Sequence, residues 1–171
     1  VLLKILARVL EEHPNVNASV MDDEIYLWES VNLGLAVDVE EGLMVPVIRD
    51  ANKKNVMTIQ KELDDLAARA RSKKLMPDDL QGGTFTLTNL GFLDVEAFTP
   101  IINPPESAIL GVGTIVDKPV VEQGEIRPGK RMTLSLSFDH RIIDGADAGR
   151  FLKRVKTYIE KPYLLLVSPA D

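Results

Sequence analysis

The residues best suited to acid–base chemistry lie near the end of the chain, where His140 is followed by Asp144 and Gly145. His140 continues the alternation of Leu136 and Phe138, so a strand that persisted to this point would turn the imidazole toward the buried side of a sheet. Partial burial favours the neutral imidazole, which accepts a proton near pH 7. His140 is therefore a candidate general base, and the alternative of a histidine merely hydrogen-bonded in a core stays open.

Asp144, Gly145 and His13 each have a purely structural interpretation. Aspartate is a preferred N-cap, so Asp144 is predicted to open a helix by accepting hydrogen bonds from first-turn amides. Gly145 supplies a turn geometry that other residues resist. His13 lies beside Pro14 at the end of a predicted helix, where an imidazole ordinarily caps carbonyl groups.

The residue types that the chain lacks narrow the chemistry. With no cysteine, it has no disulfide, thiolate nucleophile or Cys-based zinc site, and it has no Gly-x-Ser-x-Gly elbow. Two distant histidines make no metal-binding cluster, so we expect no metal. Base catalysis on an external nucleophile remains, and it needs a hydroxyl that donates to an oxyanion. Thr86 and Thr88 are candidates, although threonine also simply favours strands.

Hydrophobic periodicity predicts the elements that position these residues. Helices are expected over 1–12, 56–70 and 144–160, strands over 31–39, 43–48, 84–89, 108–115 and 132–138, and a hairpin over 122–131 with its tip at the RPGKR segment. The pair Gly111 and Gly113 lacks the third glycine and following helix of a dinucleotide site, so that interpretation is rejected. Strands mixed with packing helices predict an α/β layered domain.

Composition limits the partners of the 171-residue chain. The formal net charge of −6 and the pI of about 5.0 argue against nucleic acid, and no apolar stretch reaches the roughly 18 residues of a membrane span. The absence of cysteine fits a reducing compartment. The chain opens directly in a helical pattern, so it is predicted to begin within a domain.

Four segments together resemble a known family over nearly the whole chain. SFDHRIIDGADAGRFL (137–152) resembles the active-site segment of dihydrolipoamide acyltransferases, the acyl-transfer core of 2-oxo acid dehydrogenase complexes. Three further segments, in the family's order, are GLMVPVIRDA (42–51), GGTFTLTNLG (82–91) and FTPIINPPESAILGVG (98–113). The His-x-x-x-Asp-Gly pattern is shared with chloramphenicol acetyltransferases, whereas the Asp-His-Arg and Asn-Pro-Pro-Glu segments are more specific.

The resemblance implies a chloramphenicol-acetyltransferase-like fold, a two-layer mixed β-sheet flanked by helices. It implies reversible acyl transfer between the thiol of a dihydrolipoyl arm and coenzyme A. His140 matches the general base, Thr88 matches the hydroxyl that stabilises the oxyanion, and Asp144 matches the motif aspartate that organises the histidine loop. In the family the histidine and the hydroxyl come from neighbouring subunits of a trimer.

Cofactors and partners follow from the same resemblance. Residues 1–171 are expected to be an N-terminally incomplete catalytic domain without a lipoyl or subunit-binding domain. Coenzyme A is a substrate, and the lipoyl group is carried on a separate domain. The implied partners are a homotrimer that builds a larger core, the lipoyl domain, and the decarboxylase and dihydrolipoamide dehydrogenase components. The implied location is the cytoplasm, or the mitochondrial matrix in a eukaryote.

Two other functions stay open, a non-catalytic scaffold and an acetyltransferase acting on a small diffusible acceptor. Retention of His140 and Thr88 argues against the scaffold, which needs neither. The acyl group is undecided among acetyl, succinyl and branched-chain groups. Arg127, Lys130 and Arg131 form the one candidate basic patch for coenzyme A phosphates, and its alternative is a solvated hairpin tip.

Overall fold

A five-stranded sheet forms the centre of the computed structural model, which describes residues 1–40 and 42–166. The strand order is β6 (Val47–Ile48), β3 (Leu33–Leu35), β7 (Phe85–Asn89), β8 (Ala108–Glu122) and β9 (Glu125–Phe138). Strands β3, β7 and β8 run parallel, whereas β6 and β9 pair antiparallel at the two edges. The predicted mixed sheet is confirmed.

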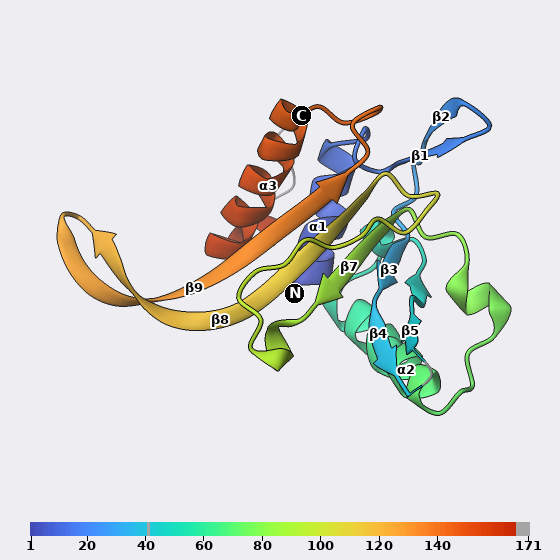
Figure 1. The fold of residues 1–171 in the computed structure, drawn as a ribbon, viewed down its shortest axis with the longest axis horizontal. Helices are drawn as coiled ribbons and strands as arrows, with labels where there is room; N and C mark the ends of the chain where they lie inside the picture. Colours follow the sequence, from blue (N-terminus) through green and yellow to red (C-terminus); the bar gives the residue numbers. More distant parts are fainter. Residues whose placement is uncertain (41, 167–171) are drawn as a thin grey trace.

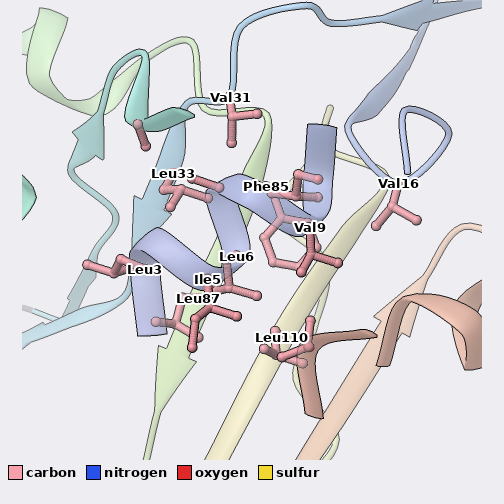
Figure 2. Packing of buried hydrophobic residues seen from close by; sticks show 14 of the residues in the cluster. Leu3, Ile5, Leu6, Val9, Val16, Val31, Leu33, Phe85, Leu87 and Leu110 are labelled. Atoms are coloured by element: carbon pink, nitrogen blue, oxygen red, sulfur yellow. The ribbon is translucent and has the colours of Figure 1, made fainter. Parts of the chain in front are cut away.

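Helices cover one face of this sheet, as the periodicity predicts. They are α1 (Leu2–Glu12), α2 (Val56–Arg71) and α3 (Gly145–Glu160), and Figure 1 shows α1 behind β7 and β8. The buried stripe of α1 includes Leu6 and Val9, which pack toward Phe85 of β7 and Leu110 of β8 (Figure 2). Burying such side chains stabilises the fold by about 1.5–3 kcal/mol each. The predicted two-layer arrangement is therefore confirmed.

The two strands predicted over 31–39 and 43–48 are each broken in two. After β3, the Ala36 amide donates to Leu87 O at 3.0 Å, and the chain then leaves the central sheet. Strand β4 (Val37–Val39) pairs only with β5 (Gly42–Met44), and β6 begins after Pro46. Proline has no amide to donate to a ladder, and the chain resumes as β6, at the edge of the central sheet, only after Pro46.

The hairpin of β8 and β9 is longer than predicted and turns at a different place. Its tip is Gln123 and Gly124, which both have positive φ angles of 53° and 85°. The RPGKR segment instead lies within β9, where Lys130 pairs in register with Asp117. In Figure 1 this arm curves away from the body of the molecule. The predicted turn at 127–131 is therefore wrong.

The remaining elements are short. Strands β1 (Ala18–Met21) and β2 (Glu24–Leu27) form a separate hairpin that the hydrophobic pattern does not predict, turning at Asp22 and Asp23, whose φ angles are positive. The 3-10 helices are η1 (Ala51–Lys53), η2 (Pro77–Leu80), η3 (Gly91–Leu93) and η4 (Pro162–Leu166). In the described part of the chain, no helix has the length and apolar character needed to cross a membrane.

Candidate active site

His140 lies in a tight turn between β9 and α3, not on the strand. Strand β9 ends at Phe138, where the Asp139 amide donates to Ser107 O and the chain departs from the sheet. The amides of Ile142 and Ile143 then both donate to Asp139 O, which closes the turn. The His140 side chain is consequently 73% exposed in the single chain. The predicted burial of His140 is wrong, because strand alternation stops where the backbone leaves the ladder.

Asp144 occupies the N-cap position of α3, but its side chain makes no capping hydrogen bond. Its backbone carbonyl accepts from the Ala148 amide, which starts the helix. The carboxylate points instead toward His140, with Oδ1 4.0 Å from Nδ1 of the imidazole. The predicted position is confirmed and the predicted capping contact is wrong. This arrangement lets Asp144 act on the histidine electrostatically.

An ion pair that the sequence pattern did not reveal flanks the histidine. Arg141 Nη2 lies 2.6 Å from Asp139 Oδ2, and the Arg141 amide donates to Asp139 Oδ1 at 2.9 Å. Hydrogen bonds from the Arg141 side chain lower the pKa of Asp139. The Phe138 ring lies 5.7 Å from the imidazole, centroid to centroid. Residues on both sides thus restrain the turn that carries His140.

Three threonines alternate along the chain from just before β7 to near its end, Thr84 preceding the strand and Thr86 and Thr88 lying within it. Thr84 Oγ1 accepts from the Asn32 amide, so its hydroxyl serves the fold. The Thr86 hydroxyl is fully buried with no hydrogen-bond partner among the described residues. Thr88 is half-buried, nearer the end of the strand, and no described residue bonds to its hydroxyl. Only Thr88 therefore combines an available hydroxyl with access from outside.

Within one chain, the sheet register keeps Thr88 and His140 apart. Thr88 pairs with Gly111 of β8, and Gly111 pairs with Ser135 of β9. Strand β9 runs three residues beyond Ser135 toward the opposite end of the sheet, about 10 Å, before the turn that carries His140. The structure therefore brings His140 and Asp144 together but does not bring Thr88 to them.

A buried carboxyl group lies on the same face of the sheet. Glu106 is 5% exposed; its Oε1 accepts from Asn103 Nδ2 at 3.3 Å, whereas Oε2 has no partner in the described structure. Burial raises the pKa of Glu106 to about 7. In the sequence Glu106 is notable only as the last residue of the Asn-Pro-Pro-Glu segment, since nothing in its spacing indicates burial.

Replacing Glu106 with glutamine is expected to flatten the pH dependence of stability. The folded pKa of about 7 exceeds the ordinary 4.5, so the folded state holds this proton more tightly. The resulting contribution to the free energy of unfolding is fully present below about pH 4.5. It decreases by about 3 kcal/mol in all as the pH rises through 7. Urea unfolding at pH 5 and pH 8 measures this. Equal pH dependence in Glu106→Gln and wild type would contradict it.

The basic patch is partly neutralised by neighbouring carboxylates. Arg127 Nη2 lies 2.6 Å from Glu125, and Lys130 Nζ lies 3.1 Å from Asp117. Arg131 and Lys130 line a groove of about 410 Å³ between β9 and α3, together with Lys153 of the helix. A phosphate of coenzyme A could thus bind the cations that line this groove, and these cations do not lie at a hairpin tip.

His13 has the structural role expected from the sequence. Its Nδ1 lies 2.9 Å from Val9 O at the end of α1, and its ring packs edge-on against Phe151 at 5.7 Å. Among the residues that the structure describes, no group of three or more His, Asp or Glu side chains could hold a metal ion. The candidate site therefore rests on His140, Asp144 and Thr88.

Comparison with known proteins gives one family. The model of the 2-oxoacid dehydrogenases acyltransferase (catalytic domain) matches residues 1–167. The acetyltransferase component of the Rickettsia bellii pyruvate dehydrogenase complex is 42% identical over 162 residues, which are 95% of this chain and 39% of that protein. The acetyltransferase component of the Bacillus subtilis acetoin cleaving system is 45% identical over 158 residues, which are 92% of this chain and 40% of that protein. The chain thus spans about two fifths of these curated relatives.

Solved structures share the fold. Azotobacter vinelandii dihydrolipoamide acetyltransferase superposes with a TM-score of 0.94 at 41% identity, covering 97% of this chain and 69% of that one. A serine, a histidine and an asparagine were studied there for their roles in the catalytic mechanism. The cubic core of a pyruvate dehydrogenase multienzyme complex superposes with a TM-score of 0.93 at 42% identity, over 97% of this chain and 69% of that one. A chloramphenicol acetyltransferase, 17% identical with a TM-score of 0.56 over 92% of this chain and 75% of that one, shares the fold alone.

Proposed function

Because the chain belongs to the family of 2-oxoacid dehydrogenase acyltransferase catalytic domains, we propose that it transfers an acyl group between a dihydrolipoyl thiol and coenzyme A. One observation carries the proposal. The serine, histidine and asparagine studied in the Azotobacter vinelandii enzyme have the same spacing along that chain as Thr88, His140 and Asp144 have here. The hydroxyl and the imidazole are thus retained in type, and the third residue remains a short polar side chain.

His140 serves as the general base in the proposed reaction. Its exposed imidazole takes the proton from the attacking thiol, and the thiolate adds to the thioester carbonyl carbon. When the tetrahedral intermediate collapses, the carbon–sulfur bond to the leaving thiolate breaks and the imidazolium returns the proton to that sulfur. A thiol with a pKa near 8.5 needs only modest help, so a single histidine is sufficient.

Thr88 supplies the electrostatic stabilisation. Its hydroxyl donates a hydrogen bond to the oxyanion that forms on the carbonyl oxygen. Because Thr88 and His140 lie at opposite ends of the sheet in one chain, the two groups that meet at one site come from neighbouring subunits of a trimer. The exposure of His140 in the single chain fits this arrangement, since a neighbour would cover it.

The substrates and partners of the whole protein are part of the same proposal. Relatives that this chain matches are components of pyruvate dehydrogenase and acetoin-cleaving systems. We propose that a lipoyl domain delivers the acyl group to this chain too. We also propose that the chain is part of a larger core, and that decarboxylase and dihydrolipoamide dehydrogenase components act together with that core. Among the described residues, His140 supplies an acid–base group and Thr88 supplies a hydrogen-bond donor. Thioester exchange requires only groups of these two kinds.

Asp144 is expected to tolerate asparagine. The amide keeps the size and polarity of the carboxylate 4.0 Å from the imidazole, and asparagine is the residue type in the Azotobacter vinelandii enzyme. Asp144→Asn should retain kcat within about threefold, whereas Asp144→Ala should lose about tenfold by loosening the turn. Steady-state transfer from acetyl-CoA to dihydrolipoamide measures both. A large loss in Asp144→Asn would show that the negative charge itself is needed.

The direct test of the proposed function is transfer from acetyl-CoA to free dihydrolipoamide by the assembled protein. We expect formation of the acyl thioester at a rate that depends on His140. An assembled particle that binds coenzyme A but transfers nothing would support a scaffold instead. Transfer to chloramphenicol-like hydroxyl acceptors, with none to dihydrolipoamide, would support the small-acceptor enzyme.

A further inference from the structure

The two residues on either side of His140 bind each other. Asp139 Oδ1 accepts hydrogen bonds from the Arg141 amide at 2.9 Å and from Arg141 Nε at 3.0 Å, and Oδ2 accepts from Nη2 at 2.6 Å. A bidentate pair of arginine and carboxylate fixes the relative orientation of both groups. His140 is therefore enclosed in a small ring of covalent bonds and hydrogen bonds, which restrains its backbone.

Asp139 connects this ring to the buried part of the fold. Its amide donates to Ser107 O at 2.8 Å, and its carbonyl oxygen accepts from the amides of Ile142 and Ile143. Ser107 is 1% exposed and Ile143 is fully buried, so both ends of the turn are anchored in the core. The exposed Arg141 is held to these anchors through Asp139.

The His140 imidazole has no hydrogen bond of its own to orient it. No described residue bonds to either ring nitrogen, and Asp144 Oδ1 is 4.0 Å from Nδ1, which is too long for a hydrogen bond. The Phe138 ring lies 5.7 Å away, centroid to centroid, and gives only an apolar contact. The direction of the imidazole is thus set by the backbone of the turn, which the pair of Asp139 and Arg141 restrains.

The charges around the imidazole also depend on this pair. The Arg141 guanidinium neutralises the Asp139 carboxylate, whose pKa is lowered by hydrogen bonds from Arg141 so that it stays ionised near pH 7. The charged groups that face the turn from other described elements are Asp144 at the start of α3 and Asp23 of the β1–β2 hairpin, which acts on Arg141. The pair therefore adds no net charge beside the imidazole.

We propose that Asp139 and Arg141 are positioning residues for acyl transfer, and that their ion pair holds the His140 imidazole in the direction from which it takes the thiol proton. The inference rests on the proposed function, since it assigns both residues to that reaction. Neither residue exchanges a proton with a substrate; both act through His140. Displacing a reacting group by about 1 Å can lower the rate by about 100-fold.

Steady-state transfer from acetyl-CoA to dihydrolipoamide by the assembled protein tests this role. Asp139→Asn and Arg141→Gln should each lower kcat by about 10-fold to 100-fold with little change in either KM. Arg141→Lys keeps the charge but not the bidentate geometry, so it should recover only part of the loss. The double variant should be no slower than the slower single variant, because the two residues act as a unit. The Arg141 side chain is 69% exposed, so thermal unfolding should shift by only a few degrees.

A second readout does not depend on activity. Neutral imidazole reacts with diethyl pyrocarbonate, and mass spectrometry follows the rate at His140 across the pH range. Arg141→Gln leaves a negative charge unpaired, which favours the imidazolium, so the half-maximal rate should move to higher pH. Asp139→Asn leaves a positive charge and should move it to lower pH. A merely structural loosening of the turn would not produce shifts of opposite sign.

The ion pair of Arg150 and Asp147 in α3 provides the matched control. It also joins an exposed arginine to a nearby aspartate, and no described hydrogen bond or ion pair links it to His140, so Arg150→Gln should leave kcat and the reagent profile unchanged. Wild-type kcat in both single variants, or pH shifts of the same sign, would overturn the inference alone. Failure of all three Asp139 and Arg141 single variants to assemble would make the pair a packing element and would also overturn it. A wild type that transfers nothing would overturn the proposed function, and the inference with it.

Discussion

Replacing His140 with alanine is expected to lower kcat for acyl transfer by about three to four orders of magnitude, near the upper limit for one general base. In the proposed reaction the imidazole takes the thiol proton, and the neighbouring Asp144 carboxylate, 4.0 Å from Nδ1, is already present in the variant and does not supply this function. The side chain is 73% exposed, so its removal should leave the free energy of unfolding of the single chain nearly unchanged. Turnover of acetyl-CoA with dihydrolipoamide measures the effect.

The second histidine supplies the control for this prediction. His13 Nδ1 lies beside Val9 O, and its ring packs on Phe151, so its role is structural and not catalytic. His13→Gln should therefore retain kcat per folded subunit, even if it unfolds at a lower temperature. If His140→Ala kept more than a tenth of wild-type turnover, the imidazole would not be the base.

Replacing Thr88 with valine is expected to lower kcat by about two to three orders of magnitude, because one oxyanion donor is typically worth that much. Valine has nearly the shape of threonine and lacks the hydroxyl, so the half-buried position should still pack and the trimer should still form. The KM for acetyl-CoA in transfer to dihydrolipoamide should change little, since the hydroxyl acts on charge that develops only in the transition state.

Two conservative variants separate this role from packing. Thr88→Ser keeps the donor and should retain turnover within about tenfold. Thr86→Val changes the fully buried neighbour on the same face, which an external substrate cannot reach, and should leave kcat per folded subunit unchanged. Full activity in Thr88→Val, or an equal loss in Thr86→Val, would contradict the assignment of Thr88.

Local periodicity is sufficient to predict the elements that hold the site. The β-rich TFTLTN stretch between glycines predicts β7, and the three- and four-residue spacing through Ala148, Phe151 and Val155 predicts α3; both are confirmed. The α3 segment buries one regular face, and β7 is a short run of β-favouring residues between glycines, so each pattern can be recognised in its own sequence. The tip of the β8–β9 arm was misplaced because Pro128 and Gly129 resemble a turn but pair as strand residues in an exposed arm.

The orientation of His140 could not be predicted in this way. Its side chain follows strand parity only while the backbone stays in the ladder, and Asp139 leaves the ladder one residue earlier to bond Ser107 O. That bond joins residues distant in sequence, so no local pattern reports it. The same holds for the Asp144 carboxylate, which faces His140 and leaves the amides of the helix uncapped.

The choice between Thr86 and Thr88 also needed more than the pattern of β7. Both threonines fit the strand equally well, and only the resemblance to the acyltransferase family favoured Thr88. The structure supplies a physical reason, since Thr86 is fully buried whereas Thr88 is only half-buried.

The claim that one site is built by two subunits has a single decisive measurement, the activity of mixed particles. His140→Ala and Thr88→Val chains would be co-expressed in equal amounts and purified as mixed trimers. If the base and the oxyanion donor come from neighbouring subunits, about a quarter of the sites in randomly mixed trimers combine an intact His140 with an intact Thr88. We predict that the mixture recovers about a quarter of wild-type turnover although each variant alone is nearly inactive. Mixed trimers as inactive as the separate variants would contradict a site shared between subunits.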